Sequence, residues 1–185
     1  MSKPLQILFV EDSHDDMDLV LDELKHAGFL PQWKRVETEA DFLAEIKTLP
    51  DIILSDYSMP RFSGIKAAEL LRGSGLGIPF ILISGTVGED IAVEAMKHGA
   101  TDYLLKDRIV RLGAAVEQAL EQKRLRDERK RAEEEIRNHL RELQQWHEAT
   151  LGREDRVLEL KREVNDLLAN QNLPARYPEA KEGTK

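Results

Sequence analysis

Four short apolar runs in the first 106 residues each lead directly into a polar side chain that can handle phosphate or a divalent cation. Each run is too short for a buried helix and is rich in Ile, Leu, Val and Phe, which is typical of a buried strand in a parallel sheet. In an open parallel sheet the ligand crevice lies at the carboxyl ends of the strands, so these polar residues are predicted to converge. The runs ILFV, DIILS, FILI and DYLL lead in turn to Glu11 with Asp12, to Asp56, to Ser84 and to Lys106.

Amphipathic stretches between the runs have the spacing of helices, so strands and helices alternate along the chain. Ser13 and Thr38 stand where helix N-caps are expected, and Gly28 and Gly99 stand where helices would end. A less apolar segment around Trp33 predicts an edge strand. The predicted fold class is α/β, a five-stranded doubly wound parallel sheet with strands near residues 6–10, 33–36, 51–55, 80–83 and 103–105.

Charge and cysteine content limit the classes of function. The formal net charge is -8, which argues against nucleic-acid binding because phosphate backbones are held mainly by Lys and Arg. The local stretch KRLRDERKR, residues 123–131, mixes acids with bases and predicts a solvated helix face. The chain has no cysteine, so disulfides, a thiol nucleophile and a zinc thiolate site are excluded.

The amino-terminal apolar run is too short for a signal sequence or a membrane span, and acidic residues follow it at once. We therefore expect no membrane insertion and a cytoplasmic location.

The last part of the chain predicts a long helix, beginning near Arg108, that forms a coiled coil. Residues 123–172 form the predicted extension, and 173–185 a flexible tail beyond it. β-Branched residues at most a positions, with Leu at the last two d positions, favour a parallel two-stranded coiled coil, and hence a homodimer. An antiparallel hairpin broken at Gly152 is the alternative. The a positions are Ile136, Leu143, Thr150, Val157 and Val164, and the d positions are Ala132, His139, Trp146, Arg153, Leu160 and Leu167.

Two histidines in this helix raise a further alternative, a phosphoryl-relay helix. His139 falls at a core d position, and His147 lies beside the core without the Thr-Pro pair of a kinase phosphoacceptor box. Packed or solvated histidines are the preferred interpretation.

Three carboxylates close together predict a cation site. Carboxylates held about 4 Å apart repel one another by a few kcal/mol per pair at an effective dielectric constant near 20. A hard divalent cation removes that penalty, and Mg²⁺ prefers a few carboxylates together with water and phosphate oxygens. Glu11, Asp12 and Asp56 are therefore the predicted Mg²⁺ ligands.

Motif pieces in order along the chain resemble the receiver domain of two-component response regulators. These pieces are VED at 10–12, LSDYSMPRFSG at 54–64, ISG at 83–85 and GATDYLLKD at 99–107. The resemblance covers residues 5 to about 122, so the predicted receiver domain is 1–122. It implies that Asp56 attacks phosphorus and becomes an aspartyl phosphate. It further implies roles for Lys106 and Ser84 at the phosphoryl oxygens, for the backbone carbonyl of Ser58 as a metal ligand, and for Tyr103 as a switch.

The chain departs from the family pattern in two places. The family usually has proline after the lysine, where this chain has Asp107, so the Lys106–Asp107 bond is either cis under strain or trans. Ser84 replaces the more common threonine. Tyr103 is either the inward-turning switch residue or an ordinary half-buried strand tyrosine.

The resemblance predicts a response regulator that receives phosphate from a histidine kinase. No DNA-binding or catalytic output segment is recognisable after the receiver, so we expect output through contacts with a protein partner. The alternatives are a dimerisation scaffold whose receiver-like domain is never phosphorylated and a Mg²⁺-dependent phosphohydrolase. The presence of the acidic residues and of Lys106 argues against a function as a scaffold. No cap or substrate-pocket segment is recognisable that would support a function as a hydrolase.

Overall fold

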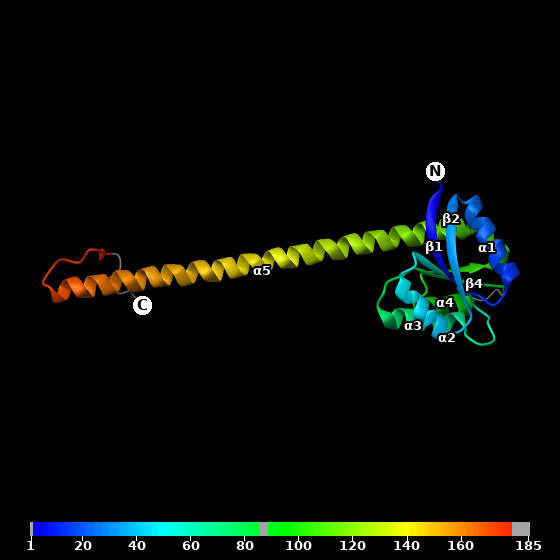
Figure 1. The fold of residues 1–185 in the computed structure, drawn as a ribbon, viewed down its shortest axis with the longest axis horizontal. Helices are drawn as coiled ribbons and strands as arrows, with labels where there is room; N and C mark the ends of the chain where they lie inside the picture. Colours follow the sequence, from blue (N-terminus) through cyan, green and yellow to red (C-terminus); the bar gives the residue numbers. More distant parts are fainter. Residues whose placement is uncertain (1, 86–88, 179–185) are drawn as a thin grey trace. The chain divides into compact units, whose positions relative to one another are not determined.

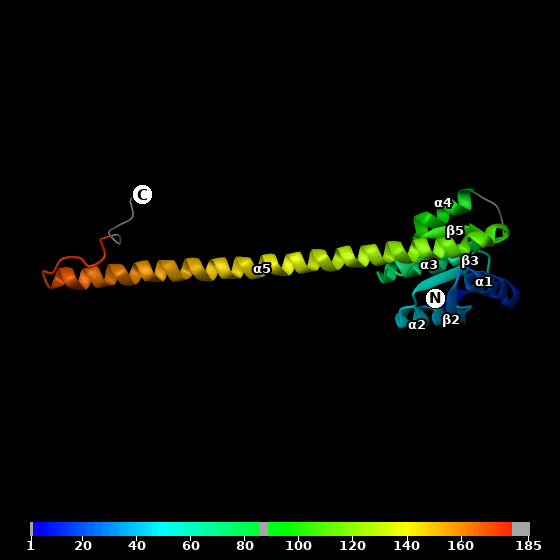
Figure 2. The same cartoon turned by 90° about the horizontal axis from the view of Figure 1, so that it is seen from above.

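The computed structural model describes residues 2–85 and 89–178. The chain divides into two compact units, Met1–Glu128 and Arg129–Lys185. The first unit contains a sheet of five parallel strands with helices in the connections, so the predicted fold class is confirmed (Figures 1 and 2).

The strand order is β2-β1-β3-β4-β5, with every neighbouring pair parallel. β2 and β5 therefore form opposite edges of the sheet, and Figure 2 shows α1 near β2 and α4 near β5. The chain reverses its direction of winding between β2 and β3, which opens a crevice at the carboxyl ends of β1 and β3. The strands are Lys3–Val10 (β1), Phe29–Val36 (β2), Ile52–Asp56 (β3), Phe80–Ser84 (β4) and Asp102–Leu105 (β5); the connecting helices are His14–His26 (α1), Glu39–Glu45 (α2), Gly64–Ser74 (α3) and Glu89–His98 (α4).

Alternate side chains of the central strands enter two separate core layers. In β1, Ile7 and Phe9 pack with apolar residues of α1 and the start of the last helix. Leu8 and Val10 face the opposite layer, where they pack with apolar residues of α2, α3 and α4. Burial on both faces explains why these strands read as continuous apolar runs rather than as alternating ones.

The predicted helix caps are present. The Ser13 side chain accepts a hydrogen bond from the Asp16 backbone N–H at the start of α1. Thr38 does the same for Asp41 at the start of α2. Gly28 follows α1 with φ +88°, a conformation that favours glycine because it has no Cβ.

The predicted start of the last helix is wrong by one turn. Residues Lys106–Arg111 form a 3₁₀ segment, η2, in which Arg108 has the non-helical angles φ -117° and ψ 27°. The α-helix α5 begins after this segment and runs from Leu112 to Asn170. Gly113 stands where α5 passes the end of α1, and a Cβ at this position would overlap the Cβ of Ala27.

The second unit consists of the distal part of α5 and the segment that follows it. α5 continues through Gly152 without a break, so the hairpin alternative is wrong. Apolar side chains of the predicted seam are exposed along it: Ile136, Leu143, Trp146, Val157, Leu160, Val164 and Leu167.

Beyond α5 the chain folds back onto its own helix. The Asn165 side chain donates to the Tyr177 carbonyl oxygen at 2.8 Å and accepts from the Tyr177 N–H at 3.0 Å. The Lys161 ammonium lies 5.5 Å from the centre of the Tyr177 ring. The part of the predicted loose tail up to residue 178 is thus attached to the helix, whereas residues 179–185 lie outside the described chain.

None of the helices in the described ranges is long and apolar enough to cross a membrane.

Candidate functional site

The carboxyl ends of β1 and β3 bring three acidic side chains together. Glu11 and Asp12 directly follow β1, and Asp56 is the last residue of β3. One carboxylate oxygen from each residue lies within 4.8 Å of the others. Val10 is paired with Ser55 in the sheet register, which places the two strand ends side by side. The convergence expected from the sequence is therefore present.

Asp56 is held at both of its carboxylate oxygens. Its side chain is only 7% exposed and pairs through Oδ1 with the Lys106 Nζ at 2.8 Å. Oδ2 accepts a hydrogen bond from the Ser58 backbone N–H at 3.0 Å. The Ser55 hydroxyl donates to the Asp56 carbonyl oxygen at 3.0 Å and so fixes the turn at the strand end. Asp56 is thus a buried carboxylate in a defined orientation, with its charge compensated by a lysine.

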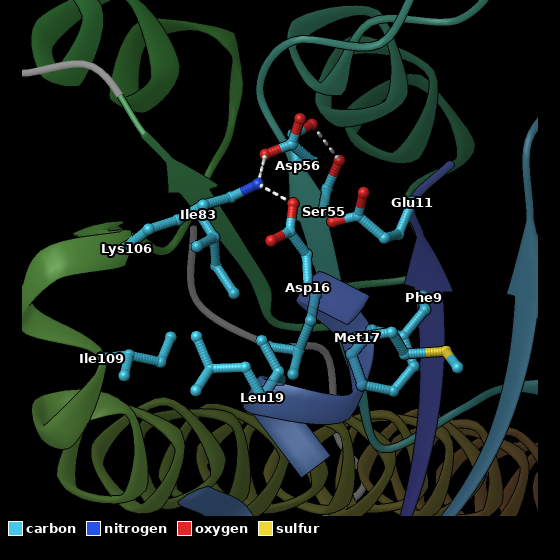
Figure 3. A pocket seen from close by; sticks show the side chains of 12 residues that line it. Phe9, Glu11, Asp16, Met17, Leu19, Ser55, Asp56, Ile83, Lys106 and Ile109 are labelled. Carbon is cyan, nitrogen blue, oxygen red and sulfur yellow. Dashed lines mark hydrogen bonds and ion pairs between the residues drawn. The ribbon is translucent and has the colours of Figure 1, made fainter. Parts of the chain in front are cut away.

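Lys106 follows β5 and reaches across the sheet to two carboxylates at once. Besides Asp56, its Nζ contacts Asp16 Oδ2 at 2.6 Å, and Figure 3 shows the ammonium between the two acids. Burial lowers the pKa of Lys106, but the hydrogen bonds that Lys106 donates to Asp16 and Asp56 outweigh burial and raise the pKa above its ordinary value. No cis peptide bond occurs in the described ranges, so the Lys106–Asp107 bond is trans.

Asp16 is the site residue that the sequence interpretation missed. It lies in the first turn of α1, beside the equally acidic Asp15. No local sequence pattern distinguishes Asp16 from Asp15, because only the packing of α1 decides which of the two adjacent acids faces the sheet.

The surroundings of Glu11 shift the pKa of its carboxyl group strongly. Burial raises the pKa of Glu11 to about 7, with a smaller raising effect from Asp56, while the hydrogen bond from the Ser13 backbone N–H opposes the rise. Asp12 is exposed, and its carbonyl oxygen accepts from the Arg35 guanidinium at 3.3 Å. Buried and exposed carboxylates thus share one small site.

Ser84 and Tyr103 come from the neighbouring strands β4 and β5. Ser84 is the last residue of β4, is 1% exposed, and is paired with Leu105 in the register. Tyr103 is paired with Leu82 and packs, partly buried, against the core layer of α2, α3 and α4. Ser84 therefore ends its strand at the same edge of the sheet as Asp56, whereas Tyr103 lies within β5.

The donor set fits Mg²⁺. Three carboxylates supply hard oxygen ligands, and Mg²⁺ characteristically binds one or a few carboxylates and keeps other positions for water and phosphate oxygens. The two buried acids, Glu11 and Asp56, repel each other across the site, and a cation would remove that cost.

Fold and site together define an α/β module that gathers acidic, hydroxyl and lysine side chains at the carboxyl edge of a parallel sheet. The chain belongs to the response regulator receiver domain family, whose model matches residues 7–117.

Two relatives and one solved structure illustrate the similarity. The chain is 29% identical over 103 residues to the two-component response regulator ARR10 of Arabidopsis thaliana, covering 55% of this chain and 18% of the relative. It is 29% identical over 174 residues to the C4-dicarboxylate transport transcriptional regulatory protein DctD of Pseudomonas aeruginosa, covering 90% of this chain and 35% of the relative. The signal receiver domain of a LuxO repressor protein from Vibrio parahaemolyticus has a TM-score of 0.59 and 25% identity, covering 67% of this chain and 95% of that one.

The chain therefore spans only about a fifth to a third of the length of these two curated relatives. Its similarity to the solved receiver domain, by contrast, extends over nearly all of that structure.

Proposed function

We propose that the protein is a phosphoacceptor response regulator in which Asp56 takes a phosphoryl group from a partner histidine kinase in a Mg²⁺-dependent reaction. The observation that carries the proposal is the arrangement around Asp56. Its buried carboxylate is paired with Lys106 and lies next to Glu11 and Asp12. An acid with these neighbours can act as a nucleophile whose attack brings a negatively charged phosphoryl group against a lysine.

In the proposed transfer, an Asp56 carboxylate oxygen forms a bond to phosphorus as the P–N bond of a phosphohistidine breaks. The electron pair of that P–N bond stays on the imidazole nitrogen. Phosphoryl transfer depends mainly on positioning and on compensation of charge at the phosphoryl oxygens. Lys106 supplies a positive charge, and the Ser84 hydroxyl supplies a hydrogen bond to one of those oxygens.

Glu11, Asp12, Asp56 and the Ser58 backbone carbonyl are the proposed Mg²⁺ ligands. When bound, Mg²⁺ neutralises charge on the transferring phosphoryl group. The protein contributes the arrangement of the ligands: the Ser13 N–H orients Glu11, and the Ser58 N–H orients Asp56.

Tyr103 and Ser84 are the proposed switch residues. Tyr103 packs partly buried against the core layer of α2, α3 and α4, so its ring can be repositioned without unfolding a strand. A movement of Ser84 toward the phosphoryl group would change the packing around the Tyr103 side chain. Such a coupled pair gives the receiver two arrangements that phosphorylation can bias.

The distal part of α5 is proposed to form a parallel coiled-coil dimer. Its a and d side chains are largely exposed in the single chain, with Leu143 at 65% and Trp146 at 75%. A helix of 59 residues cannot keep such an apolar seam in water at low cost, whereas a second copy in register would bury it. We infer that the dimer passes the signal to a protein partner, with residues 1–122 as the receiver and 123–172 as the extension.

Labelling with a small phosphodonor tests the proposal. The protein is incubated with acetyl phosphate and Mg²⁺, and the gain of one phosphoryl group is followed by intact mass. We expect labelling of the wild type, none in Asp56→Asn, and none for the wild type in excess EDTA. Asp107→Asn makes the same chemical change at an exposed residue next to Lys106 and should label normally. Undiminished labelling of Asp56→Asn would refute the assignment of Asp56.

A wild type that is never labelled, either by acetyl phosphate or by phosphorylated histidine kinases, would instead favour the scaffold function. The labelling experiment thus separates the two classes of function.

A further inference from the structure

We propose that Asp16 is a positioning residue, which holds the Lys106 ammonium at the phosphorylation site while Asp56 reacts. This inference rests on the proposed function and adds a residue to it. Its basis is a single bridge, in which the Lys106 Nζ lies 2.6 Å from Asp16 Oδ2 and 2.8 Å from Asp56 Oδ1 (Figure 3).

Lys106 needs a second anchor because its first one takes part in the reaction. A lysine side chain has four flexible carbons, and its ammonium is held only where hydrogen bonds define its place. Asp56 holds Lys106 in the resting site through Oδ1. Formation of an acyl phosphate removes the negative charge of the Asp56 carboxylate, so that partner is weakened as the new phosphoryl oxygens arrive.

Asp16 is outside the reacting group, so its contact with the Lys106 Nζ is not lost when Asp56 becomes an acyl phosphate. It belongs to the first turn of α1, where a negative side chain is favoured by the helix dipole. Its backbone N–H is bound by the Ser13 hydroxyl at the N-cap, so the turn that carries it is held in place. Asp16 is not one of the three carboxylates that lie within 4.8 Å of one another, although its charge acts on Glu11.

The lysine has enough donors for both tasks. An ammonium carries three N–H donors, of which one is directed to Asp16 and one to Asp56. The donor to Asp56 can transfer to a phosphoryl oxygen while the donor to Asp16 keeps its bond. Met17, Ile83 and Ile109 line the same pocket, and the side chains of Lys106 and Asp16 remain 26% and 40% exposed, so the bridge is partly buried.

Two substitutions at Asp16 separate positioning from charge. Asp16→Ala removes both the acceptor and the charge, whereas Asp16→Asn keeps an acceptor oxygen and removes only the charge. The matched control is Asp15→Ala, which removes an exposed acid from the same helical turn. All variants are tested as the full chain, with acetyl phosphate at saturating Mg²⁺, and thermal unfolding establishes that each is folded.

We expect Asp16→Ala to lower the rate constant of phosphorylation about tenfold, which is less than the roughly hundredfold loss that a misplacement of a reacting group by about 1 Å can cause. Asp16→Asn should recover most of the rate, and Asp15→Ala should match the wild type. In ¹⁵N spectra the Lys106 ammonium signal should be protected from exchange in the wild type and in Asp16→Asn but not in Asp16→Ala.

Equal rates for Asp16→Ala and Asp15→Ala would overturn the inference. Equal losses in Asp16→Ala and Asp16→Asn would also overturn it, because charge rather than position would then be responsible. In both cases labelling of the wild type and its loss in Asp56→Asn would leave the proposed function standing, so the two failures are distinguishable.

Discussion

The Cα of Gly64, the first residue of α3, lies so close to Asp56 that a Cβ at this position would overlap the Asp56 carbonyl oxygen. The same Cβ would also overlap the Leu82 side chain and approach the Ser55 hydroxyl to 2.8 Å. The start of α3 is therefore packed directly against the strand end that carries the acid. A glycine is required here because of this close approach.

Gly64→Ala is expected to destabilise the receiver and to slow phosphorylation of Asp56. An added methyl group in a well-packed core lowers the free energy of unfolding by about 1–3 kcal/mol. Here the backbone of Asp56 would have to move to make room for it. Urea unfolding measures the first effect and labelling with acetyl phosphate the second. Gly73→Ala in the same helix is the control, because a Cβ there meets nothing within 4 Å. It should leave labelling unchanged and add about 0.5–1 kcal/mol of stability; equal behaviour of the two variants would contradict the packing argument.

Glu11 predicts a pH dependence of stability when Mg²⁺ is absent. Burial raises the pKa of Glu11 to about 7 in the folded chain, above its ordinary value of 4.5. The folded state therefore binds a proton that the unfolded state releases between these two values. The contribution of Glu11 to stability is fully present below about pH 4.5 and is lost as the pH rises through about 7.

Urea unfolding of the wild type and Glu11→Gln in EDTA, at a series of pH values from 4.5 to 8, measures this contribution. Glutamine keeps the shape and does not titrate, so the wild type should lose stability relative to the variant as the pH rises. Parallel profiles would show that Glu11 does not titrate in this range. Added Mg²⁺ should reduce the difference above pH 7, because a cation favours the ionised carboxylate.

The strands, the caps and the convergence of Glu11, Asp12 and Asp56 could be predicted because each depends on a local pattern joined to a simple topological rule. Buried parallel strands produce continuous apolar runs, and their carboxyl ends meet at one edge. The role of Asp16 could not be predicted in this way. Asp15 and Asp16 are adjacent acids of one helical turn, and side chains about 100° apart on a helix are separated only by the packing of that helix.

Two other differences have the same origin in tertiary structure. The residues after Lys106 resemble the start of a helix, yet Arg108 adopts a non-helical conformation and α5 begins at Leu112. Tyr177 stands between Arg176 and Pro178 with no periodic pattern, and its attachment depends on the side chains of Asn165 and Lys161. Contacts made by individual side chains produce no periodic pattern in a sequence, so they cannot be predicted from one.

The proposed coiled coil predicts that a charge in the seam disrupts association. Leu143→Lys places an ammonium at an a position, whereas Gln144→Lys adds the same charge one residue away and outside the seam. Loss of a buried leucine contact costs about 2 kcal/mol per chain, and about 1.4 kcal/mol corresponds to a tenfold change in affinity. A dimer should therefore weaken by about a thousandfold in Leu143→Lys. Light scattering across a concentration series measures this, and equal masses for the two variants would argue against the seam.

The segment that folds back onto α5 predicts a local change when Asn165 is replaced. Asn165 gives and receives one hydrogen bond with the Tyr177 backbone, so Asn165→Ala removes both. Each hydrogen bond contributes about 1 kcal/mol, and exchange of the Tyr177 amide hydrogen should therefore become at least about tenfold faster. Asp166→Ala, which changes an exposed neighbour on the same helix, is the control. Asn165 lies at a b position, outside the seam of a and d residues, so the molecular mass of the protein in solution should not change. A change in this mass without faster exchange of the Tyr177 amide would show instead that Asn165 faces the second chain.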